Sequence, residues 1–390
     1  MEKNVSSAVF ADTKPHYHLL DGLRGVAALL VVWYHVFEGF AFAGGKPIIE
    51  DVNHGYLAVD FFFILSGFVV GYAYDDRWGG SLSFSGFVKR RIIRLHPMVV
   101  MGALIGLICF AFQGFMRWDG VQSPLWAVLL AFLLSALLLP AVPGSAPEVR
   151  GNGEMYPLNG PCWSLFFEYI GNLLYALILR RMRTVYLAFV VFLGGLALLW
   201  FTVADVSGYG SLGVGWTLDG MNFAGGFLRM FVPFSMGLLL SRVFRPLRIK
   251  GAFWWCTAVL FVLFHVPYIG GISKSFCLNG LFESVCILLV FPLLVWLGAS
   301  GVTTDSKSTA ICRFLGDISF PLYIVHYPLM YLFYSWLMKV GKFTLAETWP
   351  MALLVYVGSI VLAWLCLKFY DIPVRRKLVS RFLHKSEKKN

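Results

Sequence analysis

The chain has 390 residues, of which 58% are hydrophobic and only 14% charged, and its mean hydropathy is +0.73. Soluble domains carry about a quarter charged residues, so this deficit excludes a large soluble domain and indicates a polytopic membrane protein. The formal net charge of +11 is spread over short clusters beside apolar runs, as in cytoplasmic loops, and not over the basic face of a nucleic-acid-binding domain.

Eleven apolar runs are long enough to be considered as membrane spans, which need about 20 residues each. They cover residues 19–38, 56–74, 98–115, 124–141, 162–179, 184–204, 223–241, 252–270, 278–299, 311–337 and 350–370. The sequence shows neither an internal repeat nor a linker between them. We therefore expect one membrane domain over 19–376, preceded by a cytoplasmic segment 1–18 and followed by a basic cytoplasmic tail 377–390.

Clusters of arginine and lysine predict which loops face the cytoplasm. Such clusters lie in 75–97, at 180–183, at 242–250 and in the C-terminal tail. Between the first two clusters the chain leaves and returns to the same side, which needs an even number of crossings, yet three apolar runs lie there. One of the two runs between 98 and 141 is therefore expected to be re-entrant or interfacial. The prediction is an all-α polytopic transmembrane helical bundle of about ten spans, with both termini in the cytoplasm.

The first span, 19–38, carries four ionisable residues, which usually face a bundle interior or a cavity. Arg24 and His35 are eleven positions apart, so they share one helix face and lie roughly 16 Å apart along the axis. Asp21 lies one turn before Arg24, and Glu38 one turn after His35, on the same stripe. The pattern predicts charge near the cytoplasmic end and a candidate general base, His35, toward the outer half. Interfacial snorkelling is the alternative for the other three residues.

Two further carboxylates are predicted to lie inside spans. Asp60 enters from the outside in the segment GYLAVDFFFILSGF and should reach the depth of His35. A structural contact with a neighbouring helix is an equally good interpretation of Asp60. Glu168 lies two turns inside PCWSLFFEYIGNLLYAL, at a matching depth, and a carboxylate in an apolar helix requires a partner. We interpret His326, in the middle of a later span, as structural.

The segment FVKRRIIRLHP follows the second span at the inner surface. Arg91 and Arg94 are three positions apart, so a helix would place both guanidinium groups on one face, where they suit bidentate phosphate binding. The alternative is that these arginines, with Arg90, only mark a cytoplasmic loop. The histidines lack the spacing of metal ligands, and the seven cysteines lie in or beside apolar runs, so we predict no metal site.

Five segments, in this order, resemble the membrane-bound acyltransferase-3 family. They are LLDGLRGVAALLVVWYH, GYLAVDFFFILSGF, KRRIIRLHP, PCWSLFFEY and LGDISFPLYIVHYP. The resemblance extends from Leu19 to Arg376. It implies a multi-pass enzyme of the bacterial cytoplasmic (inner) membrane that transfers an acyl group, usually acetyl, from cytoplasmic acyl-CoA to a hydroxyl group. The implied acceptor is an extracytoplasmic carbohydrate, a lipid-linked glycan or a similar molecule.

The resemblance also implies roles for individual residues. His35 matches the essential histidine of the family, and Arg24 matches its paired basic residue. Arg91 and Arg94 match the Arg-x-x-Arg pair at the cytoplasmic side. The implied co-substrate is acyl-CoA, in the first place acetyl-CoA, and no metal is implied.

These observations combine into a hypothesis for the reaction. Arginines at the inner face, with Arg90 and Ser66 included in the donor site, would hold acyl-CoA. His35 would take the proton of the acceptor hydroxyl, while Glu168 or Asp60 would orient its ring. A two-step transfer through an acyl-histidine or another nucleophile is an alternative that the residues leave open.

A transporter or flippase is the competing class, because intramembrane charges also line transport pathways. Transporters commonly contain repeated halves and paired broken helices, and the sequence shows neither. Besides the donor and the acceptor, the expected partner is the lipid bilayer, and no nucleic acid is expected.

Overall fold

The computed structural model describes residues 17–46, 53–270, 276–302 and 305–383. Nearly all regular structure in these ranges is helical, and the two strands, β1 (Ile249–Lys250) and β2 (Gly301–Val302), form one short parallel pair. The predicted all-α bundle is therefore confirmed. Residues 1–16 and 384–390, which we expected to be cytoplasmic, lie outside the described residues.

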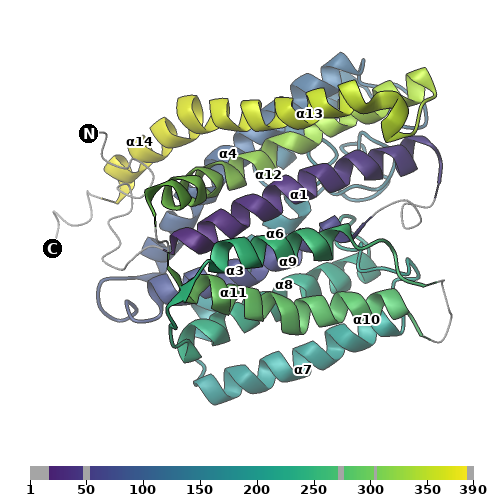
Figure 1. Cartoon of the computed structure of the whole chain (residues 1–390). Coiled ribbons are helices and arrows are strands. Elements are labelled where there is room, and N and C mark those ends of the chain that lie inside the picture. Colours follow the sequence, from purple (N-terminus) through teal and green to yellow (C-terminus); the bar gives the residue numbers. More distant parts are fainter. Residues whose placement is uncertain (1–16, 47–52, 271–275, 303–304, 384–390) are drawn as a thin grey trace.

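The helices run in alternating directions through the bundle (Figure 1). In chain order they are α1 (His18–Ala43), η1 (His54–Leu57), α3 (Ala58–Tyr74), α4 (Phe84–Phe112), α5 (Leu125–Ala136), α6 (Cys162–Leu177), η2 (Leu179–Arg181), α7 (Thr184–Val203), α8 (Gly220–Val243), α9 (Ala252–His265), α10 (Leu278–Val285), η3 (Cys286–Val290), α11 (Phe291–Ser300), α12 (Ser306–Val340), α13 (Leu345–Cys366), η4 (Leu367–Asp371) and α14 (Ile372–Phe382).

The two ends of the bundle differ in charge. The start of α1, the β1–β2 pair and α14 lie at one end, which we call the basic end (Figure 1). The arginine-rich segments 75–97, 180–183 and 242–250 cover helix ends and connections at this same end. We call the opposite end the loop end, because the long irregular segment 137–161 lies there between α5 and α6.

Helix α5 corresponds to the predicted re-entrant or interfacial segment. Its 12 residues reach only about 18 Å, well short of the roughly 30 Å of a hydrocarbon core. It follows α4 at the loop end, and the chain then returns to that end without a second helix. The return is fixed by hydrogen bonds, since Ala141 N donates to Met155 O at 2.8 Å and Tyr156 OH donates to Leu138 O at 2.9 Å.

Nine helices in the described ranges are long and apolar enough to cross a membrane, counting consecutive helical segments as one. Helix α9 is shorter, at 14 residues, yet it also connects the two ends. Strand β1, just before it, pairs with β2 at the basic end, whereas Val266, just after it, accepts a hydrogen bond from His54 Nδ1 at 2.7 Å near the loop end. With α9, the described part of the chain passes ten times between the two ends of the bundle, which is the number of crossings that the loop charges predicted.

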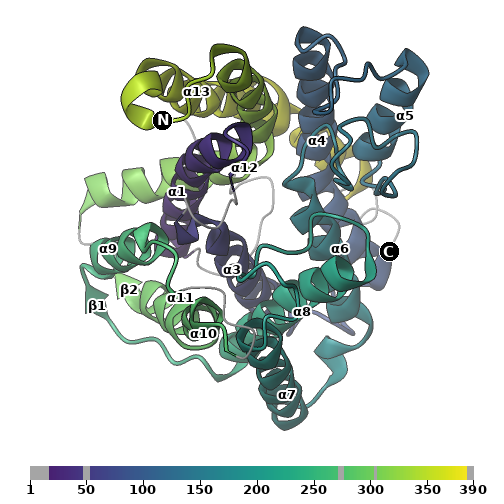
Figure 2. The same cartoon turned by 90° about the vertical axis from the view of Figure 1, so that its right-hand side faces the viewer.

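Helices α1 and α12 pack side by side along most of their length (Figures 1 and 2). Glycines bring the two backbones together near the basic end. A methyl group on Gly25 would overlap the backbone of Leu315, and one on Gly316 would overlap Asp21. Helices associate closely through small residues because lipid supplies no hydrophobic driving force between them. This contact aligns the polar stripe of α1 with α12.

Helix α3 also packs closely on α8 through glycine residues. A methyl group on Gly67 would overlap the carbonyl group of Phe234, and one on Gly237 would overlap the backbone of Ile64 and Phe68. The sequence pair Ser66–Gly67 thus marks a close helix contact. Because α3 carries Asp60 and Ser66, this contact also positions two of the predicted site residues.

We expect the substitution Gly237→Ala to lower stability by about 1–3 kcal/mol, because the added methyl group must push α3 away from α8. The thermal unfolding midpoint of the protein in detergent measures this effect. Gly358→Ala on α13 is the matched control, since that position faces open space and alanine favours a helix over glycine by roughly 0.5–1 kcal/mol. Equal midpoints for the two variants would contradict the close α3–α8 contact.

Candidate functional site

Two cavities lie inside the bundle, one toward each end. The cavity toward the basic end has a volume of about 370 Å³ and is lined by arginines and carboxylates; we call it the basic cavity. The cavity toward the loop end has a volume of about 550 Å³ and is lined by tyrosines, tryptophans and His35; we call it the aromatic cavity. Among the described residues, Val59 and Tyr323 line both, so the two cavities meet at these side chains.

His35 lies in the aromatic cavity, and its ring is held by its own helix. Its Nδ1 lies 2.6 Å from Oε2 of Glu38, one turn further along α1. The same carboxylate oxygen accepts hydrogen bonds from Tyr327 OH at 3.2 Å and Tyr334 OH at 2.9 Å, both on α12. Because Glu38 occupies Nδ1, Nε2 is the nitrogen that a substrate can approach.

The expectation that Glu168 or Asp60 orients the His35 ring is therefore wrong, because neither carboxylate contacts the ring. Glu38 contacts the ring instead, while the other two carboxylates pair with arginines. The sequence argument compared depths along the membrane. Depth does not determine the direction in which a helix presents a side chain, and that direction depends on how the helices pack.

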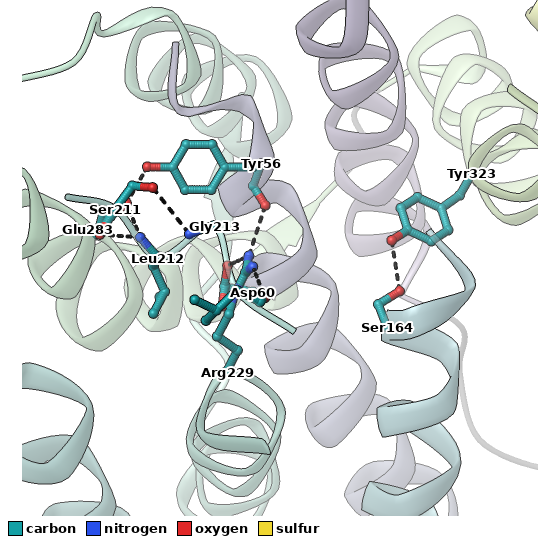
Figure 3. A network of polar contacts seen from close by, with 10 residues as sticks. Tyr56, Asp60, Ser164, Ser211, Leu212, Gly213, Arg229, Glu283 and Tyr323 are labelled. Carbon is teal, nitrogen blue, oxygen red and sulfur yellow. Dashed lines mark hydrogen bonds and ion pairs between the residues drawn. The ribbon is translucent and has the colours of Figure 1, made fainter. Parts of the chain in front are cut away.

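Asp60 forms a two-pronged ion pair with Arg229 of α8 (Figure 3). Arg229 Nε donates to Asp60 Oδ1 at 3.1 Å, and Nη2 donates to Oδ2 at 2.7 Å. Arg229 Nη1 also donates to the carbonyl oxygen of Val214 at 3.0 Å. Both charged side chains are almost completely buried, at 0% and 2% exposure. This geometry favours the structural interpretation of Asp60, as a contact between α3 and α8.

A second buried carboxylate, Glu283 on α10, lies beside this ion pair (Figure 3). It accepts two hydrogen bonds from the backbone N–H of Leu212, at 2.8 and 3.0 Å, and one from Tyr56 OH. Our sequence analysis missed Glu283. The signal was present, because a glutamate inside an apolar run is the same feature that singled out Glu168.

The ring of His326 stacks on the ring of His35, with centroids 5.2 Å apart and an interplanar angle of 29°. His326 is fully buried, and its Nδ1 lies 3.0 Å from the carbonyl oxygen of Leu322. Its Nε2 has no hydrogen-bond partner among the described residues. A residue interpreted as structural thus forms part of the immediate surroundings of the candidate base.

Glu154, in the long segment at the loop end, is a further carboxylate that the sequence analysis missed. It lines the aromatic cavity and accepts hydrogen bonds from Tyr331 OH and, at 2.8 Å, from Asn152 Nδ2. Burial raises the pKa of Glu154 to about 7. The nearby guanidinium of Arg150 is fully buried and lies 4.0 Å from the ring centre of Tyr331, which joins this segment to α12.

The basic cavity brings together the predicted donor residues. The FVKRRIIRLHP segment forms the first turns of α4, so Arg90, Arg91 and Arg94 are helical, as the three-residue spacing required. Arg91 Nη2 donates to Glu168 Oε1 at 2.9 Å, and Ser66 Oγ donates to the same oxygen at 2.5 Å. Glu168 therefore belongs to the basic cavity and not to the surroundings of His35.

Arg24 also lines the basic cavity, at its α1 wall. It donates to Asp21 Oδ1 at 3.0 Å and to Ser319 Oγ of α12 at 3.1 Å. Arg90 and Arg94, by contrast, form no ion pair with any described residue, although carboxylates lie in the same cavity. The cavity thus offers two uncommitted guanidinium groups to an anionic ligand.

Within the part of the chain that the structure describes, no group of three or more His, Cys, Asp or Glu side chains could hold a metal ion. The cavities instead offer guanidinium groups at one end, a histidine–carboxylate pair at the other, and aromatic rings around that pair. This combination suits an anionic ligand on one side and proton transfer on the other.

A sequence model described as "Acyltransferase domain" matches residues 17–368 of the chain. The curated proteins that are similar to the chain include the following three. The "Peptidoglycan O-acetyltransferase OatA" of Listeria monocytogenes is 25% identical over 92% of this chain, which spans only 55% of that protein's length. The "Acyltransferase MdmB" of Streptomyces mycarofaciens is 25% identical over 89% of this chain and 86% of its own length.

The third, "Protein 2 in picA locus" of Rhizobium radiobacter, is 37% identical over 40% of this chain and 80% of its own length. No solved structure matches the chain.

We expect Asp60→Asn to destabilise the protein by about 3–5 kcal/mol, because it leaves the buried Arg229 guanidinium without a counter-charge. Unfolding of the purified protein in increasing denaturant measures the loss. Asp119→Asn is the control, since it removes one partner of an exposed ion pair with Arg117 and should change stability far less. Similar midpoints for both variants would argue against the structural role of Asp60.

Proposed function

This chain belongs to the acyltransferase family whose sequence model matches residues 17–368, and on that premise we propose that it transfers an acyl group across the bundle. The donor is acyl-CoA, bound at the basic end, and the acceptor is a hydroxyl group of a glycan, bound at the loop end. The observation that carries this proposal is the meeting of two chemically different cavities at Val59 and Tyr323. One holds uncommitted guanidinium groups, and the other holds the His35–Glu38 pair.

The basic cavity suits the donor. The phosphate groups of CoA match the guanidinium groups of Arg90 and Arg94, because arginine binds phosphate through paired N–H donors. Arg24 lies further along the same wall, and roughly 16 Å of helix separates it from His35. An extended pantetheine arm would follow this stripe and bring the thioester toward the junction of the cavities.

The aromatic cavity suits a sugar acceptor. Trp118, Trp163 and Trp216 line it and offer flat apolar faces, while Glu154 and Asn152 offer polar groups for hydroxyls. A relative named as a peptidoglycan O-acetyltransferase supports a glycan as the acceptor. We place the basic end in the cytoplasm, following the positive-inside rule, and the loop end outside the cytoplasmic membrane of a bacterium.

The reaction needs two proton transfers, one from the acceptor hydroxyl to His35 and one from His35 to the leaving thiolate. Glu38 holds the Nδ1–H of His35, so Nε2 takes the proton of the acceptor hydroxyl as its oxygen attacks the thioester carbon. The carbon–sulfur bond then breaks, and the protonated His35 returns the proton to the thiolate of CoA. Glu38 stabilises the transient imidazolium, as a carboxylate does in a hydrolase triad. General-base assistance of this kind contributes about 10²–10⁴ in rate.

Transfer of radiolabelled acetyl from acetyl-CoA in inverted membrane vesicles tests this proposal. We expect His35→Ala to lose transfer by about 10²–10⁴-fold, and Glu38→Gln to lose a large part of it, because the ring loses its charged partner. Both variants should insert in the membrane at wild-type levels. Full activity of His35→Ala would remove this histidine from the chemistry, and labelled enzyme that accumulates in the wild type would indicate the two-step route.

We expect Arg94→Gln to raise the KM for acetyl-CoA about tenfold or more with little change in kcat, because a charged hydrogen bond to phosphate is worth about 1.5–3 kcal/mol. Arg183→Gln is the matched control: it removes an exposed arginine at the basic end that does not line the cavity. Equal KM values for the two variants would place the CoA phosphates elsewhere.

A further inference from the structure

Tyr323 on α12 occupies the junction of the two cavities. It lines both, together with Val59, and its side chain is almost fully buried. Val59 is apolar, so the Tyr323 hydroxyl is the polar group that both cavities share among the described residues. If the thioester of the donor travels from the basic cavity to His35, it passes this hydroxyl.

The Tyr323 hydroxyl has a neutral partner in the structure. It lies 2.8 Å from Ser164 Oγ on α6, as Figure 3 shows. Ser164 Oγ in turn donates to the carbonyl oxygen of Pro161, the residue before α6, at 2.9 Å. The Tyr323 hydroxyl also donates to the same carbonyl oxygen of Pro161, at 3.4 Å, so its proton rests on a neutral acceptor whichever of the two hydroxyl groups donates to the other. Its O–H group therefore points at an acceptor that a substrate oxygen can replace.

Other tyrosines of the aromatic cavity are bound differently. Tyr327 and Tyr334 donate to the carboxylate of Glu38, and Tyr331 donates to the carboxylate of Glu154. A hydrogen bond to a charged acceptor is roughly twice as strong as one between neutral groups. A neutral thioester carbonyl therefore cannot easily replace those carboxylates, whereas it can replace the serine hydroxyl beside Tyr323.

Tyr323 also lies at a suitable place relative to the candidate base. The His35 ring lies 4.8 Å from the ring centre of Tyr327, and Tyr327 follows Tyr323 by one helical turn. The ring of His326, which stacks on His35, has its centre 6.0 Å from that of Tyr323. A thioester carbon reached by a hydroxyl activated at His35 can thus direct its oxygen toward Tyr323.

We propose that Tyr323 is a catalytic residue that donates a hydrogen bond to the carbonyl oxygen of the acyl donor. This inference rests on the proposed function. As the acceptor oxygen attacks, the carbonyl π electrons move onto its oxygen, and Tyr323 exchanges Ser164 for that oxyanion. When the intermediate collapses, the carbonyl re-forms, the carbon–sulfur bond breaks, and the thiolate takes the proton held by His35. Tyr323 keeps its own proton throughout.

Steady-state kinetics of acetyl transfer from acetyl-CoA in membrane vesicles test this role with three variants. Tyr323→Phe removes only the hydroxyl and should lower kcat by about 10²–10³-fold with an unchanged KM for acetyl-CoA, as for the loss of an oxyanion donor. Ser164→Ala should raise kcat, because the phenol then has only its longer hydrogen bond, to Pro161 O at 3.4 Å, to exchange for the oxyanion. Tyr156→Phe removes a buried hydroxyl outside both cavities and should leave kcat unchanged.

The direction of the Ser164 effect separates catalysis from structure. If the Tyr323–Ser164 hydrogen bond only joined α12 to α6, the two variants that break it would lose kcat by similar factors, and that result would overturn the proposal. Wild-type kcat in Tyr323→Phe would overturn it as well. Binding of CoA to purified Tyr323→Phe at wild-type affinity shows that this variant is folded. Absence of transfer by the wild-type protein would instead overturn the proposed function itself.

Discussion

The interior of the bundle is a poor solvent for charge, and this constraint decides which helices contact one another. Asp60 of α3 reaches Arg229 of α8, and Arg91 of α4 reaches Glu168 of α6. Glu38 of α1 accepts two hydrogen bonds from tyrosines of α12. Each of these contacts gives a fully or partly buried carboxylate its partner and joins two helices at once. The positions of the charges along the helices therefore also set how the helices align.

Helices α1 and α12 carry polar groups of both cavities. Near the basic end Arg24 of α1 bonds Ser319 of α12, and near the loop end Glu38 of α1 bonds Tyr334 of α12. Glycine contacts between them keep the two backbones close. A pair of helices locked in this way holds its two ends at a constant separation. Such preorganisation suits a reaction whose two substrates approach from opposite ends.

Much of the architecture was predictable from the sequence because the determinants are local. Apolar runs and loop charges predicted about ten crossings and one incomplete segment between 98 and 141, and α5 proved to be that segment. Helical periodicity placed Arg24 and His35 on one face of α1. In the structure Arg24 lines the basic cavity and His35 lines the aromatic cavity. These inferences need only the length, hydropathy and 3.6-residue period of a single helix.

The hydrogen-bond and ion-pair partners of the predicted site residues could not be predicted from the properties of single helices. Sequence determined that Glu168 and Asp60 lie within the membrane-spanning bundle, and tertiary structure decided that neither meets His35. The partner is Glu38, one turn away on the same helix, where it is held by residues almost 300 positions later. Glu283, too, acquires its partners only when separate helices pack. The physical reason is that burial depth follows from position along one helix, whereas the direction and neighbours of a side chain depend on the rotation and contacts of several helices together.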